Sequence, residues 1–147
     1  MKDIMLKIIG RKIENDHINN EEIFEDQVEF ITEGRFYKKG KSIYLVYDER
    51  DPDGDDEVTT SLKVTGDKIK MKRYGEDLGY EAAIEFEKGK RYDGIYETPF
   101  GPFEMEVLTN DIKNNILNEG EGSLDIDYDI SLKGFSEGRN HLKIEIM

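Results

Sequence analysis

Residues 68–103 read KIKMKRYGEDLGYEAAIEFEKGKRYDGIYETPFGPF and alternate polar with apolar side chains at a period of two. This alternation is typical of β-strands that have one buried face and one solvated face. Turns that contain glycine interrupt the pattern at short intervals. The stretch therefore predicts short strands joined by tight turns rather than amphipathic helices.

The dipeptide Gly66-Asp67 is the clearest turn signal, because it separates two β-rich runs. A glycine with a positive φ angle suits the first position of a two-residue hairpin turn. This turn sets Thr60 opposite Arg73. The apolar pairs on the same face are Val64 with Ile69 and Leu62 with Met71. The other face carries the lysines and must be solvated, so Arg73 is predicted on the face that the sheet turns inward.

A second hairpin is predicted with Lys39-Gly40 as its two-residue loop. Its register gives the pairs Phe36 with Ile43, Gly34 with Leu45, Thr32 with Tyr47, and Phe30 with Glu49. The inward face of the second strand then ends at Glu49. The opposite face, which carries Tyr44 and Val46, is nearly as apolar, so the choice of face stays open. Gly34 is expected at a bend.

A third hairpin is predicted after residue 80, with a three-residue loop over 87–89 and Gly89 in the left-handed conformation. This loop sets Ile84 against Tyr92 and Ala82 against Gly94. The residues expected to point inward beside Ile84 are Tyr92, Tyr96 and Thr98. The sequence TPFG at 98–101 then reads as a reverse turn.

Alternation continues in the flanking sequence. A first strand is expected over 3–14, and further strands over 103–107, 123–132 and 142–146. Residues 110–121 fit a helical turn or a strand about equally well, and the strand is preferred. The pattern predicts an all-β fold: a closed or nearly closed antiparallel up-and-down barrel of about 8–10 strands. Closure is favoured because many regular strands would otherwise leave unpaired edges.

The totals limit the class of protein. A chain of 147 residues is long enough for one domain with a core, so a single domain over residues 1–147 is expected. The formal net charge of −13 argues against nucleic acid and anionic membranes as partners. The absence of cysteine excludes disulfides and thiolate sites. Charged residues interrupt the apolar N-terminal run, so neither a signal peptide nor a membrane span is expected, and a cytoplasmic location is predicted.

Several motifs together resemble one known family. They are Y-D-E at 47–49, K-I-K-M-K-R-Y-G at 68–75, F-x-x-G-x-x-Y-x-G-x-Y-x-T-P-F-G at 86–101, V-x-T at 107–109 and G-S-L-D-I-D-Y at 122–128. With these motifs the chain resembles the YwiB-like family of small bacterial proteins of unknown function. The resemblance implies a calycin-like (lipocalin-like) β-barrel and no known reaction. For function it implies only the general calycin habit of enclosing a small hydrophobic or amphipathic ligand.

Arg73 is the sharpest candidate for a site residue. A guanidinium inside a barrel can clamp a ligand carboxylate through two parallel hydrogen bonds. The neutral hydrogen-bond partners expected around such a ligand are Thr60, Tyr92, Tyr96 and Thr98. In the alternative interpretation Arg73 pairs with Glu49 near one end of the barrel and has a structural role, because a buried unpaired charge is costly.

Other motifs do not meet the requirements of a chemical site. The acidic run at 51–57 places Asp56 and Leu62 where an EF-hand needs Gly and Glu, so it is interpreted as a solvated loop. Three alternate residues are interpreted as the solvated face of one strand: Asp125, Asp127 and Asp129. His17 and His141 have no metal-ligand spacing and no nucleophile motif nearby. We therefore predict no metal, no cofactor and no catalytic residue, and expect that the protein is not an enzyme.

Two classes of function fit these observations. The first is a barrel that binds a small hydrophobic or amphipathic anionic ligand, with Arg73 selecting the head group and an interior lined by Leu62, Met71, Ile84, Phe86, Tyr92 and Tyr96. The second is a structural or protein-interaction module, whose small barrel is filled by these side chains and whose acidic surface meets a basic protein partner. An interior cavity favours the first class, and a solid core favours the second.

Overall fold

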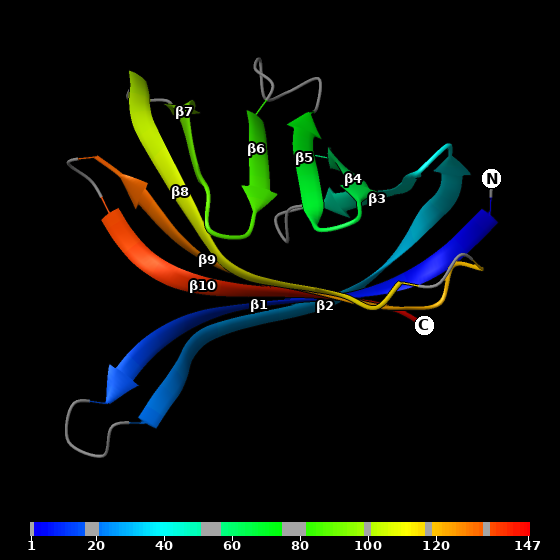
Figure 1. The fold of residues 1–147 in the computed structure, drawn as a ribbon, viewed down its shortest axis with the longest axis horizontal. Helices are drawn as coiled ribbons and strands as arrows, with labels where there is room; N and C mark the ends of the chain where they lie inside the picture. The colour runs from blue at the N-terminus through cyan, green and yellow to red at the C-terminus, as the bar shows by residue number, and fades with distance from the viewer. Residues whose placement is uncertain are drawn as a thin grey trace.

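The structure is a computed structural model and describes residues 2–16, 21–50, 57–74, 82–98, 101–116, 119–133 and 136–147. In these residues the chain forms ten β-strands of one antiparallel sheet (Figure 1). The strands are β1 Lys2–Asp16, β2 Glu21–Lys39, β3 Ser42–Arg50, β4 Glu57–Thr65, β5 Lys68–Tyr74, β6 Ala82–Glu87, β7 Arg91–Thr98, β8 Gly101–Asn114, β9 Gly122–Leu132 and β10 Ser136–Ile146. The all-β class and the strand number are as predicted.

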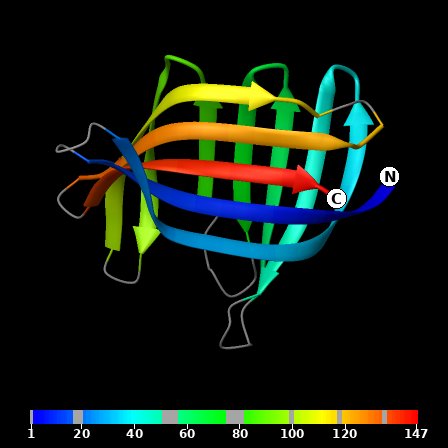
Figure 2. The ribbon, with the colours of Figure 1, turned by 90° about the horizontal axis from the view of Figure 1, so that it is seen from below.

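The sheet curls into a nearly closed barrel, which confirms the predicted architecture. Strand β10 pairs with β1, so the first and the last strand lie side by side. The strand order begins at β6 and ends at β7, so the barrel stays open between these two. Strands β8, β9, β10, β1 and β2 form one layer that runs across β3 to β7 (Figure 2).

The hairpin at Gly66-Asp67 has the predicted register. Thr60 pairs with Arg73, and Gly66 has a positive φ of 60°. The inward residues of the two strands are buried at Leu62, Val64 and Ile69. Each of the two strands has one apolar and one polar face. A two-residue turn that begins with glycine, placed between two such strands, is thus sufficient to specify this pairing.

The predicted register between β2 and β3 was wrong by two residues. Lys39 pairs with Ser42, so the loop is Gly40-Lys41, with φ of 62° at Gly40. Gly34 therefore lies opposite Tyr47 rather than Leu45, and the ladder ends there, so the predicted pairs of Thr32 and Phe30 do not form. A shift of two residues leaves each side chain on its predicted face. The structure decides the choice of face on β3 that the sequence leaves open, because Ile43, Leu45 and Tyr47 are buried.

The predicted pairing of β6 with β7 was also wrong. Within the described residues β6 pairs with β5 and β7 pairs with β8, and the pairs Ile84–Tyr92 and Ala82–Gly94 are absent. The turn chemistry was right, since Gly89 has a φ of 77°. However, the Gly89 N–H donates to the Thr109 carbonyl oxygen at 2.9 Å. The loop is thereby tied to β8, and the opening of the barrel begins at this loop.

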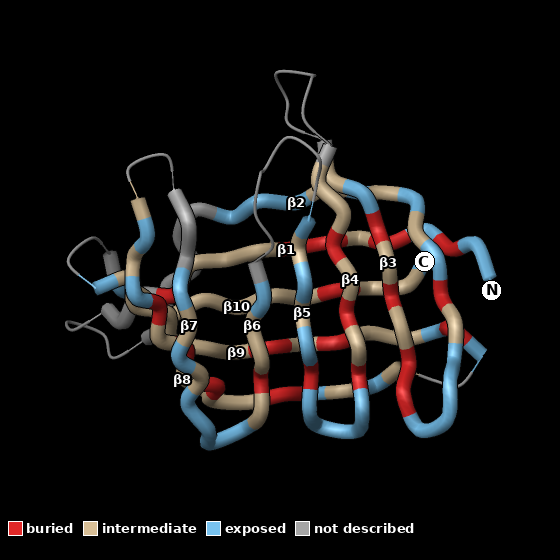
Figure 3. Tube along the Cα trace, turned by 90° about the horizontal axis from the view of Figure 1, so that it is seen from above, coloured by how far each residue is buried: buried red, intermediate tan, exposed pale blue. Residues whose placement is uncertain are grey.

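The barrel interior is filled at one end. Toward the turns at 40–41, 66–67 and 88–89 the inward side chains are fully buried, and Figure 3 shows this for β5 and β6. This buried set includes Leu6, Leu45, Leu62, Ile69, Phe86, Val107, Leu124, Ile126 and Ile144. The connection after β8 covers this end, because Asn114 Nδ2 donates to the Gly66 carbonyl oxygen at 2.9 Å and the buried Gly120 lies against the Phe36 ring. We call this the closed end.

Toward the opposite end the inward apolar side chains are only partly buried. They include Phe30, Met71 and Ile84. We call this the open end, which is where β3 and β5 finish at Arg50 and Tyr74. The barrel thus has a solid half and a more accessible half.

The ambiguous segment 110–121 starts as strand, because β8 runs to Asn114. A register shift against β9 occurs between Thr109 and Asp111, so Asn110 is an extra residue in β8. Residues 117–118 and most of the acidic run, 51–56, lie outside the described residues. In the part of the chain that the structure describes, no helix has the length and apolar character needed to cross a bilayer.

Candidate functional site

Arg73 and Glu49 form an ion pair on the inner side of the open end. Arg73 Nη2 lies 2.9 Å from Glu49 Oε2, and their side chains are 43% and 27% exposed. The Thr60 hydroxyl, which is fully buried on β4 between them, donates to the second carboxylate oxygen of Glu49 at 3.4 Å. Three of the predicted site residues are therefore brought together, and the contact between Arg73 and Glu49 that the structural interpretation required is present.

Two tyrosines that sequence reasoning did not assign to the site lie beside this cluster. Tyr47 is 3% exposed and pairs with Thr60 across the β3–β4 ladder. Burial, together with the charge of Glu49, raises the pKa of Tyr47 well above its usual value. Burial likewise raises the pKa of Tyr128, against the opposing effect of the Arg73 charge. Both phenols are therefore neutral hydrogen-bonding groups at physiological pH.

Tyr47 could have been found from the sequence, and Tyr128 could not. Tyr47 is two residues before Glu49 and therefore shares its face of β3. Tyr128 lies on β9, which the barrel closure brings against β6, and its ring centroid is 5.0 Å from that of Phe86. No local pattern predicts this approach.

Polar atoms without a protein partner face the same interior. Arg73 Nε and the Thr109 hydroxyl are both buried and make no hydrogen bond within the described residues. Thr109 is 1% exposed and lies directly opposite Tyr128. Buried polar groups are normally hydrogen-bonded, so unsatisfied ones mark a place where a further polar group would be stabilised.

The remaining predicted site residues have different outcomes. Tyr92 is partly buried and pairs with the buried Val107 near the 88–89 turn of the closed end, and within the described residues no hydrogen bond joins it to Arg73. Tyr96 and Thr98 pair by backbone with Phe103 and Gly101, and their side chains lie outside the described residues. The core of the described site is thus Arg73 with Glu49 and Thr60.

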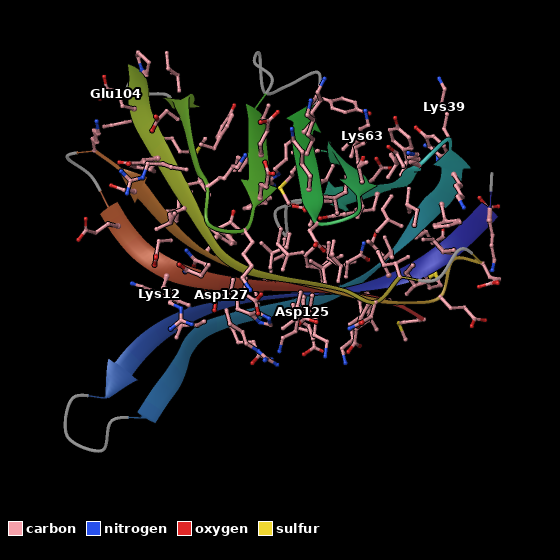
Figure 4. The ribbon with its side chains drawn as sticks, viewed as in Figure 1. Lys12, Lys39, Lys63, Glu104, Asp125 and Asp127 are labelled. Carbon is pink, nitrogen blue, oxygen red and sulfur yellow. The ribbon has the colours of Figure 1, made fainter. Side chains whose placement is uncertain are left out.

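The aspartate row of β9 lies on the outer side of the sheet, as predicted, but it is more than a solvated stripe. Figure 4 shows Asp125 and Asp127 pointing away from the barrel interior. Asp127 accepts two hydrogen bonds from Arg139, at 2.9 and 2.6 Å, and the side chains of the pair are only 20% and 31% exposed. The Arg139 guanidinium holds the pKa of Asp127 below its usual value.

The bulge in β8 extends this outer network. It places Asn110 so that its amide donates to Asp127 at 3.3 Å and to Asp129 at 3.2 Å. His141 Nε2 lies 3.0 Å from Asp125 Oδ1, with both side chains about one-fifth exposed at 19% and 22%. These contacts tie β8, β9 and β10 together. The carboxylates have partners from the protein itself, which assigns the row a structural role.

Two arginines that line a hollow of about 390 Å³ on the same outer side are also paired. Arg91 Nε lies 2.7 Å from Glu106 Oε1, and Arg139 is held by Asp127. Across the residues that the structure describes, no group of three His, Cys, Asp or Glu side chains is placed to hold a metal ion. The cluster around Arg73 is therefore the arrangement best suited to bind a ligand.

Comparison with known proteins assigns the family. Residues 12–144 match the domain of unknown function DUF1934. The chain belongs to this family. It is also 29% identical over 120 residues to the uncharacterized β-barrel protein YwiB of Bacillus subtilis (strain 168), and the alignment covers 82% of this chain and 80% of YwiB.

A solved structure supports the same fold. The crystal structure of the ywiB protein from Bacillus subtilis superposes with a TM-score of 0.69 at 23% sequence identity, covering 99% of this chain and 93% of that chain. The predicted likeness to the YwiB-like family is thus confirmed. At this level of identity the structural likeness shows the fold.

Proposed function

We propose that the protein is a non-enzymatic binding barrel whose open end takes a small amphipathic molecule with an anionic head group. The observation that carries the proposal is the position of Arg73, an inward-facing guanidinium at the rim of a partly exposed apolar interior. The ligand's apolar part would lie against Met71 and Ile84, which pair with each other across β5 and β6. Its head group would bind the guanidinium in the bidentate manner typical of arginine.

The partial exposure of the ion pair supports the replacement of Glu49 by a ligand anion as the partner of Arg73. A half-exposed pair of this kind contributes little to stability, typically about 0–1 kcal/mol, so an anionic ligand can replace Glu49 at small cost. Arg73 Nε has no partner within the described residues and would be satisfied by the incoming group. The buried Thr109 hydroxyl offers a neutral hydrogen bond deeper in the interior. The calycin-like resemblance, with its habit of enclosing small ligands, points in the same direction.

The closed end favours a second candidate. The inward side chains at this end are fully buried and fill it, as expected of a structural module. In that case the pair of Arg73 and Glu49 serves only to close the rim, and the interior has no guest. The two candidates predict different responses to ligands.

A binding experiment separates them. Isothermal titration calorimetry would compare dodecanoate with dodecanol and dodecyltrimethylammonium, three probes with the same chain and different head groups. We expect dodecanoate to bind best, and Arg73→Met to weaken its binding at least about tenfold, a loss of about 1.4 kcal/mol. The matched control is Lys70→Met, which removes another cation of β5 whose partner Glu85 lies on the outer face.

The results that contradict the proposal are equally defined. If no probe binds, or if Arg73→Met leaves dodecanoate binding unchanged, the binding barrel is excluded and the filled module remains. Native mass spectrometry of the purified protein gives an independent readout, because a retained guest appears as an added mass that Arg73→Met should lose.

A further inference from the structure

Strand β2 has a long unpaired edge. On one side β1 pairs with it from Glu21 to Phe36, whereas on the other side β3 pairs with it only from Gly34 to Lys39. Over residues 21–33 the described part of the chain provides no strand on the β3 side. Such an edge presents backbone N–H and C=O groups that can pair with an added strand.

The fork between β2 and β3 is built into the structure. A Cβ on Gly34 would lie 2.9 Å from both Leu6 Cδ1 and the Val46 carbonyl oxygen, so only glycine allows the two strands to approach closely here. Beyond this point the Thr32 hydroxyl donates to the Asp48 carbonyl oxygen at 2.9 Å and ends the ladder. Figure 1 shows β2 continuing with β1 away from β3.

The unpaired edge exposes apolar side chains on both of its faces. Val28 is 62% exposed and Ile31 is 56% exposed. Because one is at an even and the other at an odd position of the strand, they project to opposite sides of the sheet. An added strand would therefore gain apolar contact on each face besides its backbone hydrogen bonds.

The charge of the edge selects the partner. Residues 27–33 contain the acidic residues Glu29 and Glu33 and no lysine or arginine, and Glu25 and Asp26 precede them in the sequence. Glu29 Oε1 lies 3.0 Å from Lys7 Nζ of β1. A second copy of this strand would bring carboxylates against carboxylates, which is unfavourable. A basic strand would instead meet opposite charge along its length.

A hollow at the fork provides an anchor for one basic side chain. Its volume is about 410 Å³, and its lining includes the exposed carboxylates of Asp3, Glu33 and Asp48 beside Met5 and Val46. Among the described residues that line the hollow, Arg35 is the one cation. The hollow therefore combines excess negative charge with an apolar wall, which suits the stem and head of a lysine or arginine.

We propose that the β2 edge over residues 27–33 binds an extended, basic segment of a partner protein by strand addition, with a basic side chain of that segment in the hollow at Glu33. This interaction surface is separate from the interior site at Arg73. It gives the acidic surface of the protein a defined docking place.

The probe is a blocked peptide of about ten residues that alternates lysine with valine or threonine. Calorimetry measures its affinity, and amide hydrogen exchange locates its binding. We expect protection of amides within 27–33, and at least about tenfold weaker binding for Ile31→Lys and for Glu33→Lys. The matched controls are Ile95→Lys, an equally exposed apolar residue on β7, and Glu104→Lys, an exposed acid on β8.

Two altered peptides test the mode of binding. Replacing alternate residues by proline removes backbone donors, and replacing lysine by glutamate reverses the charge. Both changes should abolish binding. If the proline peptide binds as well as its parent, or if Glu104→Lys weakens binding as much as Glu33→Lys, the attraction is diffuse and the proposal fails. Absence of any binding also overturns it, and the acidic residues then serve only to protect the edge.

Discussion

Arg73 Nη2 donates a hydrogen bond to Glu49 Oε2 at 2.9 Å, and this ion pair joins β5 to β3 over the intervening strand β4. The contact is possible because Thr60, which pairs with Arg73, is small and lies next to the position of Glu49. Thr60 also donates to the same carboxylate. The pair is therefore set by strand register, while its partial exposure leaves the guanidinium accessible to a competing anion.

Removing the competing carboxylate should strengthen the binding of anions. We expect Glu49→Gln to bind dodecanoate at least about threefold more tightly, because the guanidinium then has no internal anion to release. The free energy of unfolding should change by no more than about 1 kcal/mol, since the pair is partly exposed. Calorimetry and urea unfolding measure the two quantities. Glu85→Gln, on the outer face, is the control, and weaker dodecanoate binding by Glu49→Gln would show that Glu49 positions Arg73 instead.

The outer network should make the stability depend on acid pH. The folded-state pKa of Asp127 is depressed by Arg139, so its contribution is present above the unfolded value of about 3.9 and is lost as the pH falls through the folded pKa. Asp127→Asn should lower the free energy of unfolding at pH 7 by about 1 kcal/mol. It should also make the free energy of unfolding depend less on pH at acid pH, the acid limb of the stability curve. Urea unfolding between neutral and acid pH measures this. Glu104→Gln, which breaks an exposed pair with Lys133, should leave the curve unchanged, and an unaltered acid limb in Asp127→Asn would refute the assignment.

Two glycines of the inner face should respond differently to alanine. At Gly34 the new Cβ would lie 2.9 Å from Leu6 Cδ1 and the Val46 carbonyl oxygen, so Gly34→Ala should destabilise the protein by about 1–3 kcal/mol. At Gly10 nothing lies within 4 Å, and Gly10→Ala should be neutral or slightly stabilising. Thermal and chemical unfolding of the two variants test this contrast. Equal changes in stability for the two variants would mean that the close approach of β2 and β3 at Gly34 does not require glycine.

Alkaline pH should destabilise the barrel through Tyr47. Its folded-state pKa is raised by burial and by Glu49, so its contribution is full below the unfolded value of about 10 and is lost as the pH rises above it. Tyr47→Phe should reduce the slope of stability against pH above about 10, because phenylalanine has no group that titrates there. The control is Tyr37→Phe, whose ring stacks on Tyr44 outside the barrel. Identical alkaline slopes for the wild type and Tyr47→Phe would contradict the prediction.

The parts of the fold that the sequence predicts correctly depend on local chemistry. The glycine turn at 66–67, between two strands that each have one apolar and one polar face, specifies the β4–β5 pairing. This pairing also sets the inward position of Arg73. The β2–β3 register differs by two residues from the predicted one because Lys39-Gly40 and Gly40-Lys41 are both acceptable loops. A shift by two leaves the hydrophobic pattern on the same face, so that pattern cannot distinguish them.

The candidate site likewise contains some features that local patterns predict and others that only the tertiary structure shows. The β4–β5 register predicts that Arg73 and Thr60 are neighbours on the inward face, whereas the face of the strand that carries Glu49 is left open by the sequence. The approach of Tyr128, the outward Asn110 of the bulge, and the pairing of Asp127 with Arg139 involve strands whose neighbours are chosen by closure of the sheet. Local patterns contain no information on that choice.

By itself, therefore, the sequence determined the all-β class, the inward faces of β4 and β5 and the inward position of Arg73, because these follow from side-chain period and turn chemistry. Only the tertiary structure decided that β10 closes on β1, that the opening lies between β6 and β7, and that no described strand pairs with the β3 side of β2 over residues 21–33. These features depend on which strands satisfy each other's backbone groups across long separations in sequence. That competition is settled by the packing of the whole barrel, so Arg73 is placed at its rim by contacts that no single stretch contains.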